Sequence, residues 1–196
     1  MTDAIPLGPF LLRINIEHTP SPRDPKGADE YYKALGILLV AWGRLEGHFV
    51  ACLLTLLAMP EGKTLGEKNL PMKWDSRAAM WGKAFDTLPI LQQFKEAASV
   101  LLKEIQEVAL DRHAIVHALW EPFNPDDPPT IGIVSIKRKK GTTNGLDIQR
   151  ASISRDMIKE IGEKANRLNL ALIPLSQFLT RYRTAQKPPP ADIRTI

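Results

Sequence analysis

The chain has 196 residues, of which 44% are apolar and 24% are charged, and its formal net charge is +4. This length supports one full hydrophobic core, so we expect a single domain rather than a small cross-linked scaffold. Cys52 is the only cysteine, which excludes an intramolecular disulfide and a cysteine-based zinc cluster. The net charge and a pI near 9.2 favour anionic partners but do not identify them.

The sequence carries no signal for secretion or for membrane insertion. Its first thirty residues hold no basic segment followed by an apolar one, and nowhere do eighteen apolar residues follow one another without interruption. We therefore expect a soluble, cytoplasmic protein without a membrane partner.

The first predicted helix spans residues 28 to 58. Its apolar residues recur at alternating spacings of three and four, which indicates one face turned toward a partner. The members of this face are Leu35, Leu38, Trp42, Leu45, Phe49, Cys52 and Leu56. Gly36, Gly43 and Gly47 lower helix propensity in the same segment, so we expect another backbone to approach closely there.

Two further helices are predicted before residue 121. One begins with Asp75 or Ser76 as its N-cap and ends at Thr87, before a proline. The other runs from about Leu91 to Trp120. Its apolar face comprises Phe94, Ala98, Leu101, Ile105, Val108, Arg112, Ile115 and Leu119, and one of these residues is an arginine.

The rest of the chain predicts a β-hairpin and one more helix. After a proline-rich loop at 122–129, two alternating segments, Thr130 to Lys137 and Leu146 to Ile153, read as antiparallel strands. Ser154 is then expected to cap a long helix that ends near Tyr182.

The predicted fold class is therefore mainly all-α. Residues 28–183 form a bundle of four to five helices, with the hairpin at about 130–153 inserted before the last helix. Residues 1–27 form a short extended arm and loop, and residues 184–196 form a proline-rich flexible tail.

Arg112 stands at a position where the helix spacing calls for an apolar side chain. A guanidinium cannot lose its charge to escape burial, so Arg112 needs either an anionic partner or a wet cleft. One interpretation is a buried ion pair with Glu46, which lies beside the apolar face of the first predicted helix.

Two histidines follow this arginine. His113 and His117 are four residues apart and share one helix face, whereas Arg112 and His117 are about 140° apart on an ideal helix. Only the long arginine side chain, or a local distortion, would bring Arg112 and His117 to one site. The histidine pair could alternatively bind zinc, with further ligands from acidic residues, His18 or His48.

The segment from Arg112 to His117 resembles the motif of the HEPN superfamily (higher eukaryotes and prokaryotes nucleotide-binding domains). That motif has an arginine, a polar residue, three further residues and a histidine near the end of a long helix, and Trp120 follows it here. The resemblance extends over about residues 30–120 and 154–183, and it includes Glu46 on the first helix. Ala118 departs from the glycine often found after the motif histidine.

The resemblance implies a four-helix fold that commonly forms homodimers. Many such domains are metal-independent endoribonucleases, often toxins paired with an antitoxin protein or nucleases of defence systems. It implies Arg112 and His117 as catalytic residues, His113 as the polar motif member and Glu46 as a supporting residue, with RNA or a nucleotide as ligand and with no cofactor or metal. The alternative is an inactive nucleotide-binding or protein-interaction module, since some members have lost catalysis, and a purely structural bundle is a third interpretation.

The chemistry is consistent with these residue types. RNA supplies its own nucleophile, the 2′-hydroxyl, so the protein need only move protons and stabilise the charge that develops on phosphorus. Histidine is suited to proton transfer at neutral pH, and arginine offers a permanently charged, two-pronged donor to phosphate oxygens.

Other basic and aromatic residues have two interpretations each. A basic cluster at the predicted hairpin tip could follow a phosphate backbone, or it could be a solvated tip that protects strand edges; it comprises Lys137, Arg138, Lys139 and Lys140. Trp42, Trp74, Trp81 and Trp120 could stack on bases, although helical spacing favours core positions for Trp42 and Trp81.

Overall fold

The computed structural model describes residues 28–66, 69–124, 130–138 and 146–186. The predicted arm at 1–27 and nearly all of the predicted tail lie outside these residues. The described chain is mainly helical and carries a small antiparallel sheet, as expected. Its elements are α1 (Ala28–Leu57), η1 (Pro60–Leu65), α2 (Trp74–Thr87), η2 (Pro89–Phe94), α3 (Lys95–His117), β1 (Leu119–Asn124), β2 (Thr130–Arg138), β3 (Leu146–Ser154) and α4 (Arg155–Ala185), where η denotes a 3₁₀ helix.

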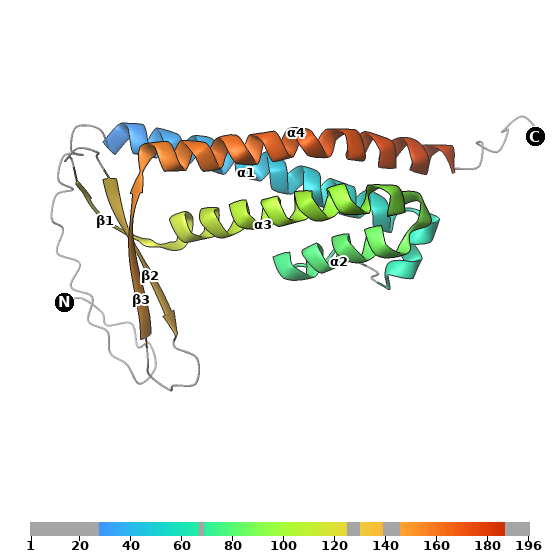
Figure 1. The fold of residues 1–196 in the computed structure, drawn as a ribbon, viewed down its shortest axis with the longest axis horizontal. Coiled ribbons are helices and arrows are strands. Elements are labelled where there is room, and N and C mark those ends of the chain that lie inside the picture. The colour runs from blue at the N-terminus through green and yellow to red at the C-terminus, as the bar shows by residue number, and fades with distance from the viewer. Residues whose placement is uncertain (1–27, 67–68, 125–129, 139–145, 187–196) are drawn as a thin grey trace, which may run out of the picture.

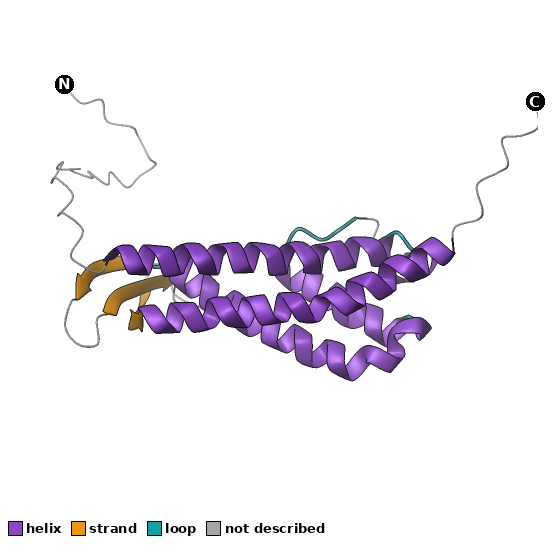
Figure 2. Cartoon of the chain, turned by 90° about the horizontal axis from the view of Figure 1, so that it is seen from above, coloured by secondary structure: helices purple, strands orange, loops and turns teal. Residues whose placement is uncertain are grey.

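The helices run lengthwise and the sheet closes one end of the molecule. α1 and α4 lie side by side along the long axis, α3 lies beneath them, and α2 is outermost (Figure 1). The view from above shows the same pairing of α1 and α4 (Figure 2). The sheet lies where α1 and α4 begin and where α3 ends, so the last turns of α3 are at the junction of helices and sheet.

The predicted apolar face of α1 is confirmed, but the prediction for its glycines is wrong. Leu38, Leu45 and Phe49 are fully buried. In contrast, a Cβ placed at any of the three glycines of α1 would meet nothing within 4 Å, because they lie on the solvent side of the helix. The close approach occurs instead at Gly162 of α4, where a Cβ would lie 3.4 Å from the Leu38 backbone.

The starts of α2 and α4 differ in how they are capped. α2 begins at Trp74 after Lys73, which makes no side-chain capping hydrogen bond, so Asp75 and Ser76 are first-turn residues and not the predicted cap. The prediction for α4 is confirmed, since the Ser154 side chain accepts a hydrogen bond from the Met157 N–H at 3.2 Å. A cap side chain thus satisfies one unpaired backbone donor of α4.

The motif helix α3 is shorter than predicted at both ends. Its expected first turn forms the separate 3₁₀ helix η2, which starts with Pro89, and its expected last turn is strand β1. Apolar spacing alone could not separate these segments, because Leu119 fits a helix stripe as well as a strand. The Trp120 indole donates a hydrogen bond to the Ile115 carbonyl at 2.8 Å and so satisfies a backbone acceptor at the helix end.

The sheet has three antiparallel strands in the order β1-β2-β3. The predicted hairpin is confirmed as β2 and β3, paired from Thr130 with Ser154 to Arg138 with Leu146. β1 was not predicted, because its first residues were assigned to the helix and those from Pro122 onward to a loop. The register shifts between Trp120 and Phe123, which is the kind of irregularity that admits a proline in a strand.

The buried side chains form two clusters. The larger lies among the helices and includes Val108 of α3; the smaller joins the start of α1 to the sheet and to α4, and it includes Ile115. Arg112 falls between these two residues in the apolar stripe of α3. The stripe can therefore admit a charged side chain at the position where it passes from one cluster to the other.

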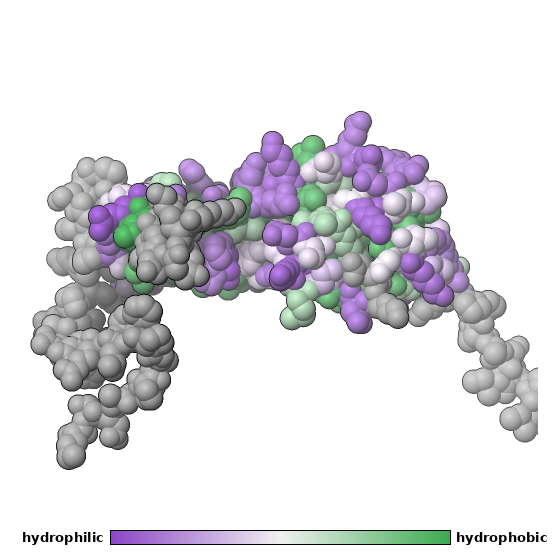
Figure 3. Space-filling view, turned by 90° about the horizontal axis from the view of Figure 1, so that it is seen from below, coloured by the Kyte–Doolittle hydropathy of each residue, from purple (hydrophilic) through white to green (hydrophobic). Residues whose placement is uncertain are grey.

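The surface outside the clusters is mixed. Seen from the α2 side, hydrophobic patches alternate with hydrophilic side chains (Figure 3). Over Asp29–Leu57, α1 is long and apolar enough to span a membrane by length and composition, with 39% of its most apolar window buried in the fold. The buried part of α1 is the stripe that packs on the other helices, and core helices of soluble proteins show the same composition.

Candidate functional site

The three motif residues lie on the last two turns of α3, next to the sheet. Ile115 is 2% exposed and packs in the smaller cluster, and the hydrogen bond from Trp120 holds the backbone of the same turn. The end of the helix is therefore anchored on its buried side. His113 and His117 face solvent, and Arg112 is half-buried.

Arg112 and His117 come together despite their separation around the helix. Arg112 Nη1 lies 3.5 Å from His117 Nε2, which is a long hydrogen bond. The helix is regular to His117, so the reach of the arginine side chain closes the gap. Because a guanidinium can only donate, Nε2 is the acceptor in this contact.

The two histidine rings are also neighbours. Their centroids lie 4.5 Å apart with an interplanar angle of 47°, as expected for residues four apart on one helix face. Two imidazoles and one guanidinium therefore share a small area at the exposed end of α3.

Arg112 has a buried donor without a partner, and the residue also lines a groove. Among the described residues, Arg112 Nε and Glu61 Oε2 are the buried side-chain atoms without a hydrogen-bond partner. The groove has a volume of about 700 Å³, and its lining comprises Trp42, Glu46, Trp74, Asp75, Gln106, Ala109, Leu110, Arg112 and His113. A buried donor without an acceptor costs free energy, so the guanidinium of Arg112 is incompletely paired within the protein.

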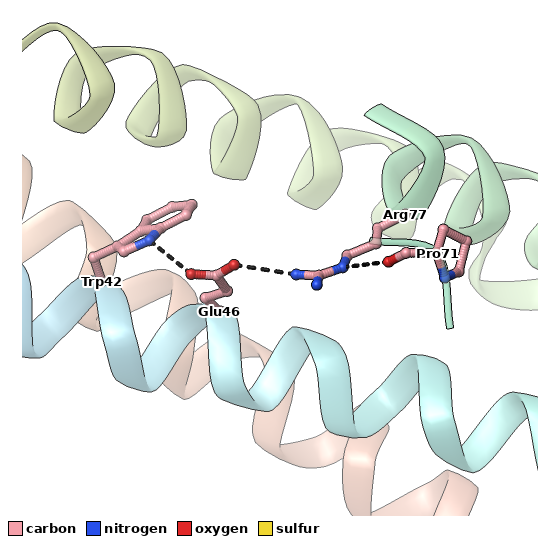
Figure 4. A network of polar contacts seen from close by, with 4 residues as sticks. All are labelled: Trp42, Glu46, Pro71 and Arg77. Atoms are coloured by element: carbon pink, nitrogen blue, oxygen red, sulfur yellow. Dashed lines mark hydrogen bonds and ion pairs between the residues drawn. The ribbon is translucent and has the colours of Figure 1, made fainter. Parts of the chain in front are cut away.

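The alternative ion pair between Arg112 and Glu46 is not formed. In the part of the chain that the structure describes, Glu46 Oε1 pairs with Arg77 Nη1 at 3.1 Å, and Glu46 Oε2 accepts from the Trp42 indole at 3.0 Å (Figure 4). Both carboxylate oxygens thus have partners. Glu46 lies on the groove wall opposite Arg112, and its contacts fix that wall rather than neutralise the arginine.

Arg77 is a site residue that sequence reasoning missed. Its Nε also donates to the Pro71 carbonyl at 2.8 Å, so the guanidinium links α1 and α2 to the loop between them. A signal was available, since Arg77 lies three residues after Trp74 and four before the buried Trp81. The reasoning that singled out Arg112, a cation at an apolar spacing, applies equally to Arg77.

The described residues contain no cluster of side chains that would support zinc binding. No group of three or more His, Cys, Asp or Glu side chains that could hold a metal occurs there. His48 is far from the motif, and its Nδ1 lies 2.6 Å from Asn169 Oδ1. His18 lies outside the described residues.

The structure describes only two of the four residues of the predicted basic tip. Lys137 and Arg138 are the last residues of β2, and Lys139 and Lys140 lie outside the described residues. The end of β2 belongs to the sheet, whereas the groove lies between α1, α2 and α3, and neither Lys137 nor Arg138 is among the residues that line it.

Comparison of the chain with models of protein families, with curated proteins and with solved structures finds no match.

Proposed function

We propose that this protein is an RNA-cleaving enzyme of the metal-independent endoribonuclease type. The observation that carries this proposal is the contact between Arg112 and His117 at the exposed end of α3, beside a groove that Arg112 lines. An RNA strand supplies what this arrangement lacks, namely anionic phosphate oxygens for the guanidinium and a 2′-hydroxyl proton for the imidazole to accept.

The proposed reaction uses the RNA 2′-hydroxyl as nucleophile. When Arg112 turns to the phosphate, His117 Nε2 is released from its contact with Arg112 and accepts the 2′-hydroxyl proton. The 2′-oxygen forms a bond to phosphorus, and the bond from phosphorus to the 5′-oxygen breaks. Arg112 stabilises the negative charge on the phosphate oxygens. His113, in its protonated form, returns a proton to the leaving 5′-oxygen, so the products are a 2′,3′-cyclic phosphate and a 5′-hydroxyl.

The direct test is RNA cleavage by the purified full chain in buffer with EDTA. We expect cleavage that leaves cyclic phosphate ends, and we expect His117→Ala to lower the rate about 10²- to 10⁴-fold, the usual contribution of a general acid or base. Gln106→Ala changes a groove residue that does not act as an acid or base, so it should lower the cleavage rate far less than His117→Ala. Cleavage that persists unchanged in His117→Ala would overturn the assignment. Nucleotide binding without any cleavage would favour the inactive binding module instead.

The expected partners are also part of the proposal. The family resemblance implies a homodimer and, for a toxin, an antitoxin protein that covers the site. Light scattering during size exclusion tests the homodimer: a mass near 44 kDa, twice the 21.9 kDa of one chain, would support it. A mass of one chain at every concentration would contradict it.

A further inference from the structure

The groove extends well beyond the site where the phosphate would bind. Gln106 lies six residues before Arg112 on α3, which corresponds to about 9 Å of helix rise. Ala109 and Leu110 line the turn between them, and Trp42 and Trp74 line the opposite side. A single phosphate at Arg112 would leave most of the volume of about 700 Å³ unfilled.

The charges on the two walls differ. α3 contributes Arg112 and His113, whereas α1 and α2 contribute the carboxylates Glu46 and Asp75. The charge of Glu46 is compensated by Arg77 at 3.1 Å, so Asp75 is the carboxylate that disfavours a phosphate at the other wall, whereas the α3 wall attracts one. A ligand group that reaches the carboxylate wall should be uncharged and should carry N–H donors, as a nucleobase does.

The aromatic residues of the groove offer one stacking surface. Trp42 is 6% exposed and its indole N–H is bonded to Glu46, so it is part of the core. Trp74 is half-buried, with its ring centroid 5.7 Å from Trp42 and 5.2 Å from Phe49. No base fits between two rings this close. Trp74 is instead held from behind and presents its remaining surface to the groove.

The polar groups of the groove differ in whether they already have partners in the protein. Glu46 already accepts from Trp42 and Arg77, so its carboxylate is occupied. Asp75 is exposed and Gln106 is half-buried, and both line the groove. A carboxylate with two acceptor oxygens fits adjacent N–H donors, which the guanine edge provides.

We propose that this groove is a nucleobase subsite in which the base of the bound nucleotide stacks on Trp74 and presents its N–H edge to Asp75. The inference rests on the proposed function for one point, the binding of the attached phosphate at Arg112. Stacking of a base on an aromatic side chain strengthens binding about 5- to 150-fold.

The test measures binding of small ligands to the full chain by calorimetry, so that it does not depend on catalysis. The probes are GMP, UMP and ribose 5-phosphate, which share a phosphate but differ in the base. We expect GMP to bind about 5- to 150-fold more tightly than ribose 5-phosphate, with UMP between them. Trp74→Ala should abolish the advantage of GMP, and Trp74→Phe should keep most of it. Equal affinity of the wild type for GMP and ribose 5-phosphate would overturn the subsite.

A second pair of variants tests the subsite independently of whether Trp74→Ala folds. Ala109→Phe fills the groove, so it should reduce GMP affinity to that of ribose 5-phosphate. Ala79→Phe places the same side chain on an exposed position of α2 outside the groove and should leave GMP affinity unchanged. If both variants bind GMP like the wild type, the subsite is wrong. RNA cleavage together with no base-dependent binding would overturn the subsite alone, and base-dependent binding without cleavage would overturn the proposed enzyme alone.

Discussion

Arg77 and Arg112 lie on different helices that contribute to one groove, and both occupy positions where helix spacing calls for an apolar residue. The Arg77 side chain is 16% exposed, and its donors reach the Glu46 carboxylate and the Pro71 carbonyl. Arg112 has a long contact with His117 and a buried Nε without an acceptor. The Nε and Nη1 donors of Arg77 therefore both have oxygen acceptors in the protein, whereas Nε of Arg112 has none.

This difference separates a structural role from a functional one. A guanidinium with its partners in the protein stabilises the fold and has little left to offer a ligand. A guanidinium that lines a groove and is incompletely paired lowers the free energy of unfolding, and it remains available to an anionic ligand. The same reasoning explains why Glu46 serves the groove wall, although it was expected to support Arg112.

The largest effect should follow from Arg112→Ala. We expect RNA cleavage to fall about 10²- to 10³-fold, the usual loss when a donor to a developing charge is removed. The free energy of unfolding should change by less than about 1 kcal/mol, because the variant removes an unsatisfied group and leaves no buried partner behind. Cleavage rates and urea unfolding curves of the same preparations measure both quantities. A large loss of stability together with intact cleavage would reverse the roles assigned to the two arginines.

Arg77→Met should show the opposite profile. This variant keeps the length of the side chain but leaves the Glu46 carboxylate without its cation, so we expect unfolding to become about 1–2 kcal/mol easier. For a chain of this length, each kcal/mol lowers the melting temperature by about 2–4 °C. Cleavage should fall less than tenfold, through a looser groove wall. Arg181→Met, at an exposed position of α4, is the matched control and should leave the melting temperature unchanged.

Much of the fold could be predicted from the sequence because its helices rest on long periodic stripes. The stripe of α1, the hairpin of β2 and β3, and the Ser154 cap each depend on local patterns that the structure keeps. β1 was missed because its pairing with β2 is a tertiary contact, and a proline within it indicated a loop. The end of α3 was misplaced for the same reason, since Leu119 and Trp120 continue the helix pattern but belong to the sheet.

The candidate site was predictable in its composition but not in its pairing. The motif spacing placed Arg112, His113 and His117 at the end of one helix, and the structure brings them within contact of one another. The sequence could not show that Glu46 pairs with Arg77, because that contact joins residues 31 positions apart on different helices. The sequence named Trp74 among four tryptophans that could stack on bases, but it could not show that Trp42 and Phe49 lie against Trp74, because that contact is set by the packing of α1 on α2.

The smallest effect concerns Glu61, the other residue with an unsatisfied buried atom. Glu61 Oε1 accepts hydrogen bonds from Gln186 at 2.7 Å and from Tyr182 at 3.0 Å, which join η1 to the end of α4. The bond from Gln186, with that from Tyr182, holds the pKa of the Glu61 carboxyl below its ordinary value. The ionised carboxylate is thus favoured in the folded state, so its stabilisation is present above about pH 4.3, the ordinary carboxyl pKa, and is lost as pH falls through the lowered pKa.

Glu61→Gln should therefore lower stability at pH 7, and the difference from the wild type should shrink below about pH 4. Urea unfolding midpoints at pH 7 and at pH 3.5 measure this difference, with Glu163→Gln, an exposed change on α4, as control. RNA cleavage at pH 7 should be the same in all three proteins, because Glu61 is far from α3's last turns and lines no part of the groove. A pH-independent difference would mean that Glu61 acts through packing, and a change in cleavage would mean that an unsatisfied buried atom outside the groove also bears on function.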